Sequence, residues 1–96
     1  MIVMRYTFQI KPGKDDEALK LAKDGRKNIW PSATSRIYTS NIGPNNTIVI
    51  ENEHKDLAEQ RKHSSQVVAK EEWGPWYARW TELITGNGMN EVWNLE

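Results

Sequence analysis

Residues 2–10 alternate strictly between two kinds of side chain. The even-numbered positions are apolar or aromatic, whereas the odd-numbered positions after Val3 are polar. A period of two among β-branched and aromatic residues predicts a strand with one apolar face. Residues 11–14, Lys-Pro-Gly-Lys, end this strand, because proline cannot extend the ladder and glycine supplies a turn. The chain is therefore expected to build a sheet, and its other segments must pair with this strand or cover its apolar face.

The middle of the chain predicts a helix followed by a hairpin. Residues 15–17 are acidic, which suits the positive end of a helix dipole, and Asp15 is the expected N-cap. Small and apolar residues at helical spacing then make one stripe, and Pro31 stops the helix. Residues 35–42 and 47–53 have strand character and flank a Gly-Pro-Asn-Asn turn, so they are expected to form a hairpin.

The last part of the chain predicts a second helix and a closing strand. Asp56 and Glu59 are spaced as in a capping box, and residues 73–75 interrupt the helix with a proline that suits a new first turn. Residues 85–88 are expected to end the second helical piece through glycine, and residues 89–96 to form a strand. The order β-α-β-β-α-β predicts a ferredoxin-like α+β fold, in which an antiparallel sheet carries its helices on one face.

Length and composition narrow the class of protein. The chain has 96 residues, which is enough for a single domain over residues 1–96 with a thin core. The absence of cysteine excludes disulfides, zinc–thiolate sites and cysteine nucleophiles. Thirteen basic residues balance thirteen acidic ones, which argues against nucleic acid as a partner. No apolar run is long enough for a membrane span, and residues 1–5 lack the pattern of a signal peptide, so a cytoplasmic location is expected.

One face of the expected sheet is left without helices. A thin core without disulfides is commonly supplemented by a partner subunit. Arg5, Thr7 and Gln9 belong to this face, because they alternate with the apolar positions of the first strand. The open face is therefore expected to pair with the sheet of an identical subunit, which gives a homodimer.

Several segments resemble the dimeric α/β-barrel superfamily. They are Arg5-Tyr6-Thr7 in the first strand, the turn Pro12-Gly13-Lys14 before an acidic helix start, the aromatic end of the second helix, and Asn90-Glu91-Val92-Trp93 in the last strand. Within that superfamily the chain looks most like NIPSNAP-like and antibiotic-biosynthesis-monooxygenase-like domains. The resemblance implies two ferredoxin-like subunits whose sheets form a barrel, with a ligand pocket between sheet and helices. Such proteins include cofactor-free oxygenases, haem-degrading enzymes and many without a known activity, so the fold alone does not choose a reaction.

Arg5 is the first candidate for a functional residue. It lies in the middle of the first strand, on the face that would point into a barrel. The strand order 4-1-3-2 that the fold implies makes Glu51 and Glu91 its expected neighbours. Arg5 is then either an anion-binding residue of a catalytic site or one partner of a cross-strand ion pair.

The two histidines, His54 and His63, lie in polar surroundings, where histidines are usually solvated. His63 is the better candidate for a general base, because the polar half of the second helix is expected to border a wet cleft. Glu51, Glu53 and His54 carry metal-compatible groups without a metal-binding spacing, so they are interpreted as a solvated strand edge and no metal is expected. No cofactor is expected either. The haem-degrading relatives use an asparagine on the first strand, a tryptophan and a later histidine, whereas here the first strand has no asparagine and both histidines come before Trp73.

Tryptophan is unusually frequent, with five in 96 residues and four of them after residue 70. The aromatic residues between positions 73 and 80 recur at helical spacing, which predicts a single stripe on the second helix. Such a stripe is either core, packed on Tyr6, Phe8 and Trp93, or the wall of a pocket for a flat aromatic ligand. The expected ligand-binding residues are Tyr6, Trp73, Trp76, Tyr77 and Trp80.

Three functions stay open on the sequence. In the first, the protein binds an apolar or aromatic small molecule between helices and sheet. In the second, it is a cofactor-independent monooxygenase of the antibiotic-biosynthesis type, with His63 and Arg5 as candidate catalytic residues. In the third, it is a non-catalytic protein-interaction module. The sequence does not decide whether the protein is an enzyme.

Overall fold

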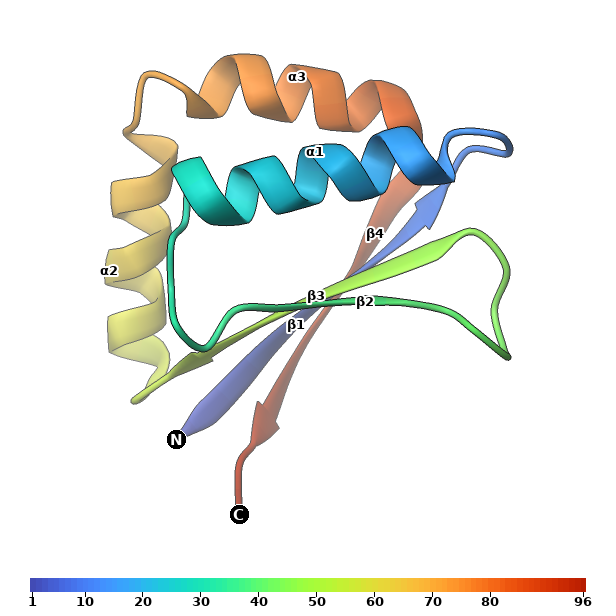
Figure 1. Cartoon of the computed structure of the whole chain (residues 1–96). Helices are drawn as coiled ribbons and strands as arrows, with labels where there is room; N and C mark the ends of the chain where they lie inside the picture. The colour runs from blue at the N-terminus through green and yellow to red at the C-terminus, as the bar shows by residue number, and fades with distance from the viewer.

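The computed structural model describes residues 1–96, apart from the side chain of Asn87. In chain order the elements are β1 (Ile2–Ile10), α1 (Asp15–Asn28), β2 (Arg36–Thr39), β3 (Thr47–His54), α2 (Leu57–Val68), α3 (Trp73–Leu83) and β4 (Ile84–Asn94). The strands form one antiparallel sheet in the order β2-β3-β1-β4. The three helices lie on one face of this sheet and leave the other face uncovered (Figure 1). The predicted element order, strand order and layering are confirmed.

The inner strand β1 determines which side chains meet the helices. Its even-numbered side chains point towards them, and Tyr6 and Phe8 pack against the buried core. Its odd-numbered side chains lie on the uncovered face, where Arg5 pairs with Glu51 of β3 on one side and Glu91 of β4 on the other. These are the neighbours expected from the strand order. The predicted hairpin also forms, although β2 is shorter than the expected strand over 35–42.

Small residues let α1 approach the rest of the core closely. Ala18 and Ala22 are fully buried, so the predicted stripe is confirmed. Gly25 lies on the same stripe, and the rings of Trp30 and Trp76 meet against it edge to face, with centroids 5.0 Å apart. The core under α1 is therefore aromatic, and it depends on the absence of a side chain at Gly25.

The N-termini of helices α1 and α2 are capped in different ways. The Asp56 carboxylate accepts a hydrogen bond from the backbone N–H of Glu59 at 2.9 Å, and the Glu59 carboxylate accepts one from the N–H of Lys55 at 3.2 Å. The predicted capping arrangement at α2 is thus confirmed. The prediction of Asp15 as N-cap of α1 is wrong, because Lys14 holds that position without a side-chain bond. Asp15 instead begins the first turn, where its charge still favours the helix dipole.

The predicted turn over residues 85–88 is wrong. Helix α3 ends at Leu83, and β4 starts at once at Ile84. The register between β1 and β4 shifts between Thr7 and Gln9, so β4 bulges there. Gly86 and Gly88 have φ of 69° and 75°, a conformation that glycine adopts without steric cost. The two glycines therefore serve a bulge inside a strand, and they do not cap a helix.

The expectation that Trp93 packs with the aromatic stripe is also wrong. Trp93 pairs with Val3, an odd-numbered residue of β1, and so lies on the uncovered face with 51% of its surface exposed. The guanidinium carbon of Arg5 lies 5.6 Å from the centroid of its ring, a cation–π contact. The antiparallel register of β4 places the whole sheet between Trp93 and the helices.

Candidate functional site

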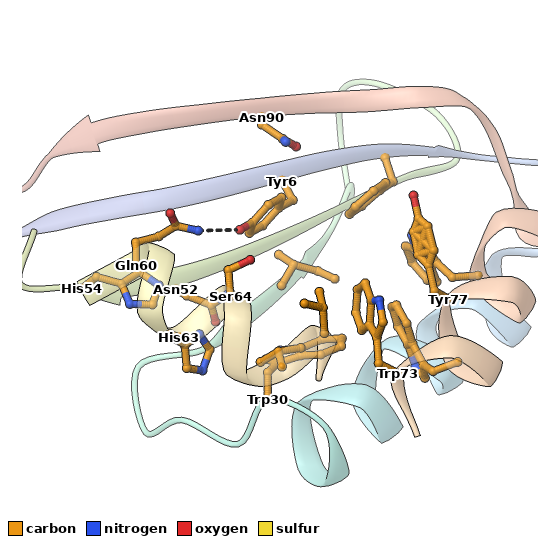
Figure 2. Close-up of a pocket in the computed structure, with 16 residues that line it drawn as sticks. Tyr6, Trp30, Asn52, His54, Gln60, His63, Ser64, Trp73, Tyr77 and Asn90 are labelled. Atoms are coloured by element: carbon orange, nitrogen blue, oxygen red, sulfur yellow. Dashed lines mark hydrogen bonds between the residues drawn. The ribbon is translucent and has the colours of Figure 1, made fainter. Parts of the chain in front are cut away.

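A cavity of about 310 Å³ lies between the helix-facing side of the sheet and helices α2 and α3. Figure 2 shows its two unlike ends: Trp73 and Tyr77 stand at one, and His54, Asn52, His63 and Gln60 gather at the other. Its volume falls at the small end of the range of ligand pockets. The described residues that line it are Tyr6, Phe8, Trp30, Ile50, Asn52, His54, Gln60, His63, Ser64, Val67, Val68, Trp73, Trp76, Tyr77, Trp80 and Asn90.

The aromatic end is built by one face of α3. Trp76 stacks on Trp73 at a centroid distance of 5.6 Å and on Trp80 at 5.3 Å, and Tyr77 contacts Trp73 at 5.2 Å. Trp76 and Trp80 are buried, whereas Tyr77 is 44% exposed. The stripe therefore has both of the roles that the sequence left open, core and cavity wall. Its inner rings are core, and its outer rings form the wall and mouth of the cavity.

The polar end is built by β3 and α2. Asn52 and His54 follow the buried apolar residues of β3 on the helix-facing side, and both are 7% exposed. Gln60 and His63 share one face of α2, because they are three residues apart on a helix. The rings of His54 and His63 lie 5.3 Å apart, and the Nδ1 atom of His54 is 4.0 Å from the Glu59 carboxylate.

The two titratable cavity groups with shifted pKa values are both uncharged at neutral pH. Partial burial lowers the pKa of His63, the nearby His54 and Lys70 lower it further, and Glu59 opposes this. Burial raises the pKa of the Tyr6 phenol, whose oxygen accepts a weak hydrogen bond from the Gln60 amide at 3.5 Å. Neutral His63 can accept a proton from a ligand, and the protonated phenol of Tyr6 can donate a hydrogen bond to one.

Two buried polar atoms among the described residues have no hydrogen-bond partner, and both belong to residues that line the cavity. They are the side-chain oxygen of Asn52 and the indole nitrogen of Trp80. Buried polar groups are paired in the great majority of cases, so such atoms call for an explanation. The Trp76 indole, by contrast, donates to the Leu21 carbonyl at 2.9 Å, which ties this ring to α1.

The interpretation of Glu51, Glu53 and His54 as a solvated strand edge is wrong. Glu51 is 8% exposed and His54 is 7% exposed, because β3 is an inner strand and α2 covers its end. The expectation that His54 is solvated fails for the same reason. Sequence reasoning also missed Asn52, although its position two residues from both Ile50 and His54 placed it on the apolar face.

The predicted site residues fall into two groups in space. All five expected ligand-binding residues and His63 line the cavity. Arg5 lies on the opposite side of the sheet, so the structure does not bring it together with His63. There its Nε donates to the Glu51 carboxylate at 2.6 Å, and the Tyr38 hydroxyl donates to the other oxygen of Glu51 at 3.2 Å. The cross-strand ion pair, the second of the two roles considered for Arg5, is thus present.

The described residues contain no group of three or more His, Cys, Asp or Glu side chains placed to hold a metal ion. They also contain no helix with the length and apolar character needed to cross a membrane.

Comparison with solved structures identifies the fold. An uncharacterised NIPSNAP domain protein from Burkholderia xenovorans matches with a TM-score of 0.85 and 20% identity, over 100% of this chain and 95% of that chain. A protein from Agrobacterium tumefaciens matches with a TM-score of 0.84 and 23% identity, over 98% and 92% of the two chains. An antibiotic biosynthesis monooxygenase matches with a TM-score of 0.73 and 17% identity, over 100% and 99%. At these identities the likeness concerns the ferredoxin-like fold alone.

Sequence comparison identifies the family. No curated protein matches the sequence. The NIPSNAP family profile matches residues 4–92, and this range covers every strand and helix of the fold almost completely. Both resemblances expected from the sequence, to NIPSNAP-like and to antibiotic-biosynthesis-monooxygenase-like domains, are thereby confirmed. The chain belongs to the NIPSNAP family.

Proposed function

We propose that this protein binds an apolar or aromatic small molecule in the cavity between the sheet and helices α2 and α3. The observation that carries the proposal is the cavity itself, which is walled by stacked tryptophan rings on one side and polar groups on the other. Pockets for small molecules are mostly apolar, with a few polar groups that fix orientation. Flat rings are favoured as ligands, because they can stack on Trp73 and Tyr77 at the mouth.

Titration with 2-naphthol is expected to reach this cavity. In ¹H–¹⁵N spectra, four indole N–H signals should shift, because their rings line the cavity; they belong to Trp30, Trp73, Trp76 and Trp80. The Trp93 signal should stay in place, because that ring lies across the sheet. Shifts of equal size at all five tryptophans would contradict binding in the cavity.

A matched pair of tyrosine variants tests the same point by affinity. Tyr77→Ala should weaken 2-naphthol binding about tenfold, because one stacking partner is lost. Tyr38→Ala is the control, since Tyr38 is 45% exposed, almost the same as Tyr77 at 44%, but lies on the uncovered face. If neither variant changes the affinity and no indole signal shifts, the protein-interaction function becomes the better explanation.

The second candidate is a cofactor-independent monooxygenase, favoured by the neutral His63 in the cavity and by the likeness to an antibiotic biosynthesis monooxygenase. In the simplest balanced reaction, a CH₂ group of the substrate and O₂ give a carbonyl group and water. His63 would accept the proton that leaves the carbon before oxygen reacts. Oxygen uptake by the complex with a ring ketone that bears such a CH₂ group would favour this candidate over simple binding.

A homodimer through the uncovered sheet face is part of the proposal, as is a cytoplasmic location. The face carries exposed large side chains at Tyr38, Met89 and Trp93. Four of its charged side chains neutralise one another in pairs, since Arg5 bonds Glu51 and the Arg36 guanidinium bonds Glu53 at 3.2 Å. Paired charges cost less to bury than single ones, so this face can be covered by a second copy.

Trp93→Glu is expected to convert the dimer to a monomer, because it replaces a large exposed ring of this face by a further carboxylate, while Arg5 nearby is already bonded to Glu51. Light scattering at micromolar concentration should show the mass falling by half. Leu57→Glu is the control, because Leu57 is similarly exposed but lies on α2. A monomeric mass for the unchanged protein would contradict the proposed dimer.

A further inference from the structure

The cavity is polar at one end without being charged. Its described lining residues include no lysine, arginine, aspartate or glutamate. Asn52, Gln60 and Ser64 offer amide and hydroxyl groups, and His54 and His63 are the only lining groups that can become cationic near neutral pH. The charge state of the histidines therefore decides which ligands this end accepts.

The surroundings of His63 favour its neutral ring. His63 faces His54 across 5.3 Å, and a charge on both would be repulsive. Lys70 adds a third basic group nearby, but its ammonium donates a hydrogen bond to the Ile29 carbonyl, at the end of α1. Glu59, beside His54, supplies the one opposing carboxylate and is about half exposed. The phenol of Tyr6, on β1, is uncharged.

A charged ligand would find no fixed partner in these surroundings. An anion beside His63 would need that ring to gain a proton against burial and against its neighbours. A cation would meet no carboxylate among the described lining residues. Because burying a charge without a partner is strongly unfavourable, both kinds of ligand are disfavoured.

Asn52 indicates what an uncharged ligand must supply. Its side-chain oxygen is buried and has no hydrogen-bond donor, while the residue lines the cavity beside His54 and His63 (Figure 2). A buried amide oxygen without a donor destabilises the protein, whereas a leucine of similar shape at this position would not. If the amide turns so that this oxygen faces the cavity, a ligand that donates a hydrogen bond to it removes that defect on binding.

We propose that the ligand is an uncharged aromatic molecule whose hydroxyl or N–H group donates a hydrogen bond to the side-chain oxygen of Asn52. This inference rests on the proposed binding function, and it adds the class of ligand and the residue that selects it. The ring lies against the tryptophans of α3, and the donor group reaches the polar end formed by β3 and α2.

Four probes with the same ring system test this selection at neutral pH. They are 2-naphthol, which donates; 2-methoxynaphthalene, which only accepts; naphthalene, which does neither; and 2-naphthoate, which is an anion. We expect 2-naphthol to bind about tenfold more tightly than 2-methoxynaphthalene, as for one buried hydrogen bond gained. The 2-naphthoate anion should bind most weakly of the four.

Asn52→Leu should abolish the preference for 2-naphthol while 2-methoxynaphthalene binds as before. The same variant should unfold at an equal or higher urea concentration, because the unpaired oxygen is gone. Asn90→Leu is the matched control, since Asn90 also lines the cavity but is exposed on β4, and it should keep the preference.

The outcomes separate this inference from the function on which it rests. If none of the probes binds the unchanged protein, the proposed binding function itself fails. If all four bind with similar affinity, or if 2-naphthoate binds most tightly, the cavity binds ligands but the inference is overturned. The comparison of probes on the unchanged protein does not depend on any variant, so it holds even if Asn52→Leu does not fold.

Discussion

Replacing Trp80 with alanine is expected to lower the free energy of unfolding by about 4 kcal/mol. Trp80 is 2% exposed and is the largest of the fully buried side chains described. Its ring meets Phe8 of β1 edge to face at 5.0 Å and stacks on Trp76 at 5.3 Å. It therefore joins α3 to the sheet, and its removal leaves a cavity that the two neighbouring rings cannot fill.

Urea unfolding followed by far-ultraviolet circular dichroism measures this change, because that signal does not depend on tryptophan emission. Trp80→Phe should cost much less, about 1 kcal/mol, since a ring remains and the unpaired indole N–H is removed. Trp93→Phe, on the uncovered face, should change stability by less than about 1 kcal/mol. All samples need the same protein concentration, because a dimer gains stability with concentration. A loss below that of Trp93→Phe would show that Trp80 is not the core residue described.

The helical spacing of the aromatic residues predicts that they share one face of the helix, but it cannot predict how deeply each ring is buried. Periodicity fixes the direction of a side chain around a helix axis, and Trp73, Trp76, Tyr77 and Trp80 do share a face. How far each ring lies from solvent depends on where α2 crosses next to α3, which is tertiary information. This is why core and pocket could not be separated in the sequence, and why both descriptions hold for different rings of the stripe.

The polar end of the cavity was the least predictable part of the site. Asn52 and His54 extend the alternation of β3, so their face could be read from the sequence. Their burial could not, because it depends on α2 returning over the end of β3. The sequence alone therefore predicts a solvated His54, and it gives no reason to single out Asn52.

The start of β4 and the face on which Trp93 lies could not be predicted from the sequence for a different reason. Gly86 and Gly88 suggested a helix end, because glycine is as common in C-caps as in bulges. Only pairing with β1 distinguishes the two, since the shift occurs between Thr7 and Gln9 of the partner strand. The same pairing decides the face of Trp93, which is why its placement also failed. By contrast, β1 and α1 were predictable because their patterns are local.

Gly25→Ala is expected to destabilise the protein although alanine is the better helix former. A Cβ atom at this position would lie 2.4 Å from two ring atoms of Trp30 and 2.9 Å from one of Trp76. Neither ring can withdraw easily: the Trp30 indole donates to the Ser35 hydroxyl at 3.3 Å, and the Trp76 indole donates to the Leu21 carbonyl. Overpacking of about 3 kcal/mol outweighs a gain of about 1 kcal/mol in helix propensity, so the expected net loss is about 2 kcal/mol.

The control is Gly74→Ala on α3, where an added Cβ would meet no atom within 4 Å outside the two neighbouring residues of the chain. It should change stability by less than about 1 kcal/mol in the same urea experiment, because the gain in helix propensity is opposed by the ring of the following Pro75. Trp30→Phe combined with Gly25→Ala should recover part of the loss, because the clashing atoms belong to the far edge of the indole. Strict additivity of these two changes would mean that Gly25 is required for the backbone of α1. Non-additive effects of the two changes would show that Gly25 is needed to make room for the rings of Trp30 and Trp76, which line the cavity.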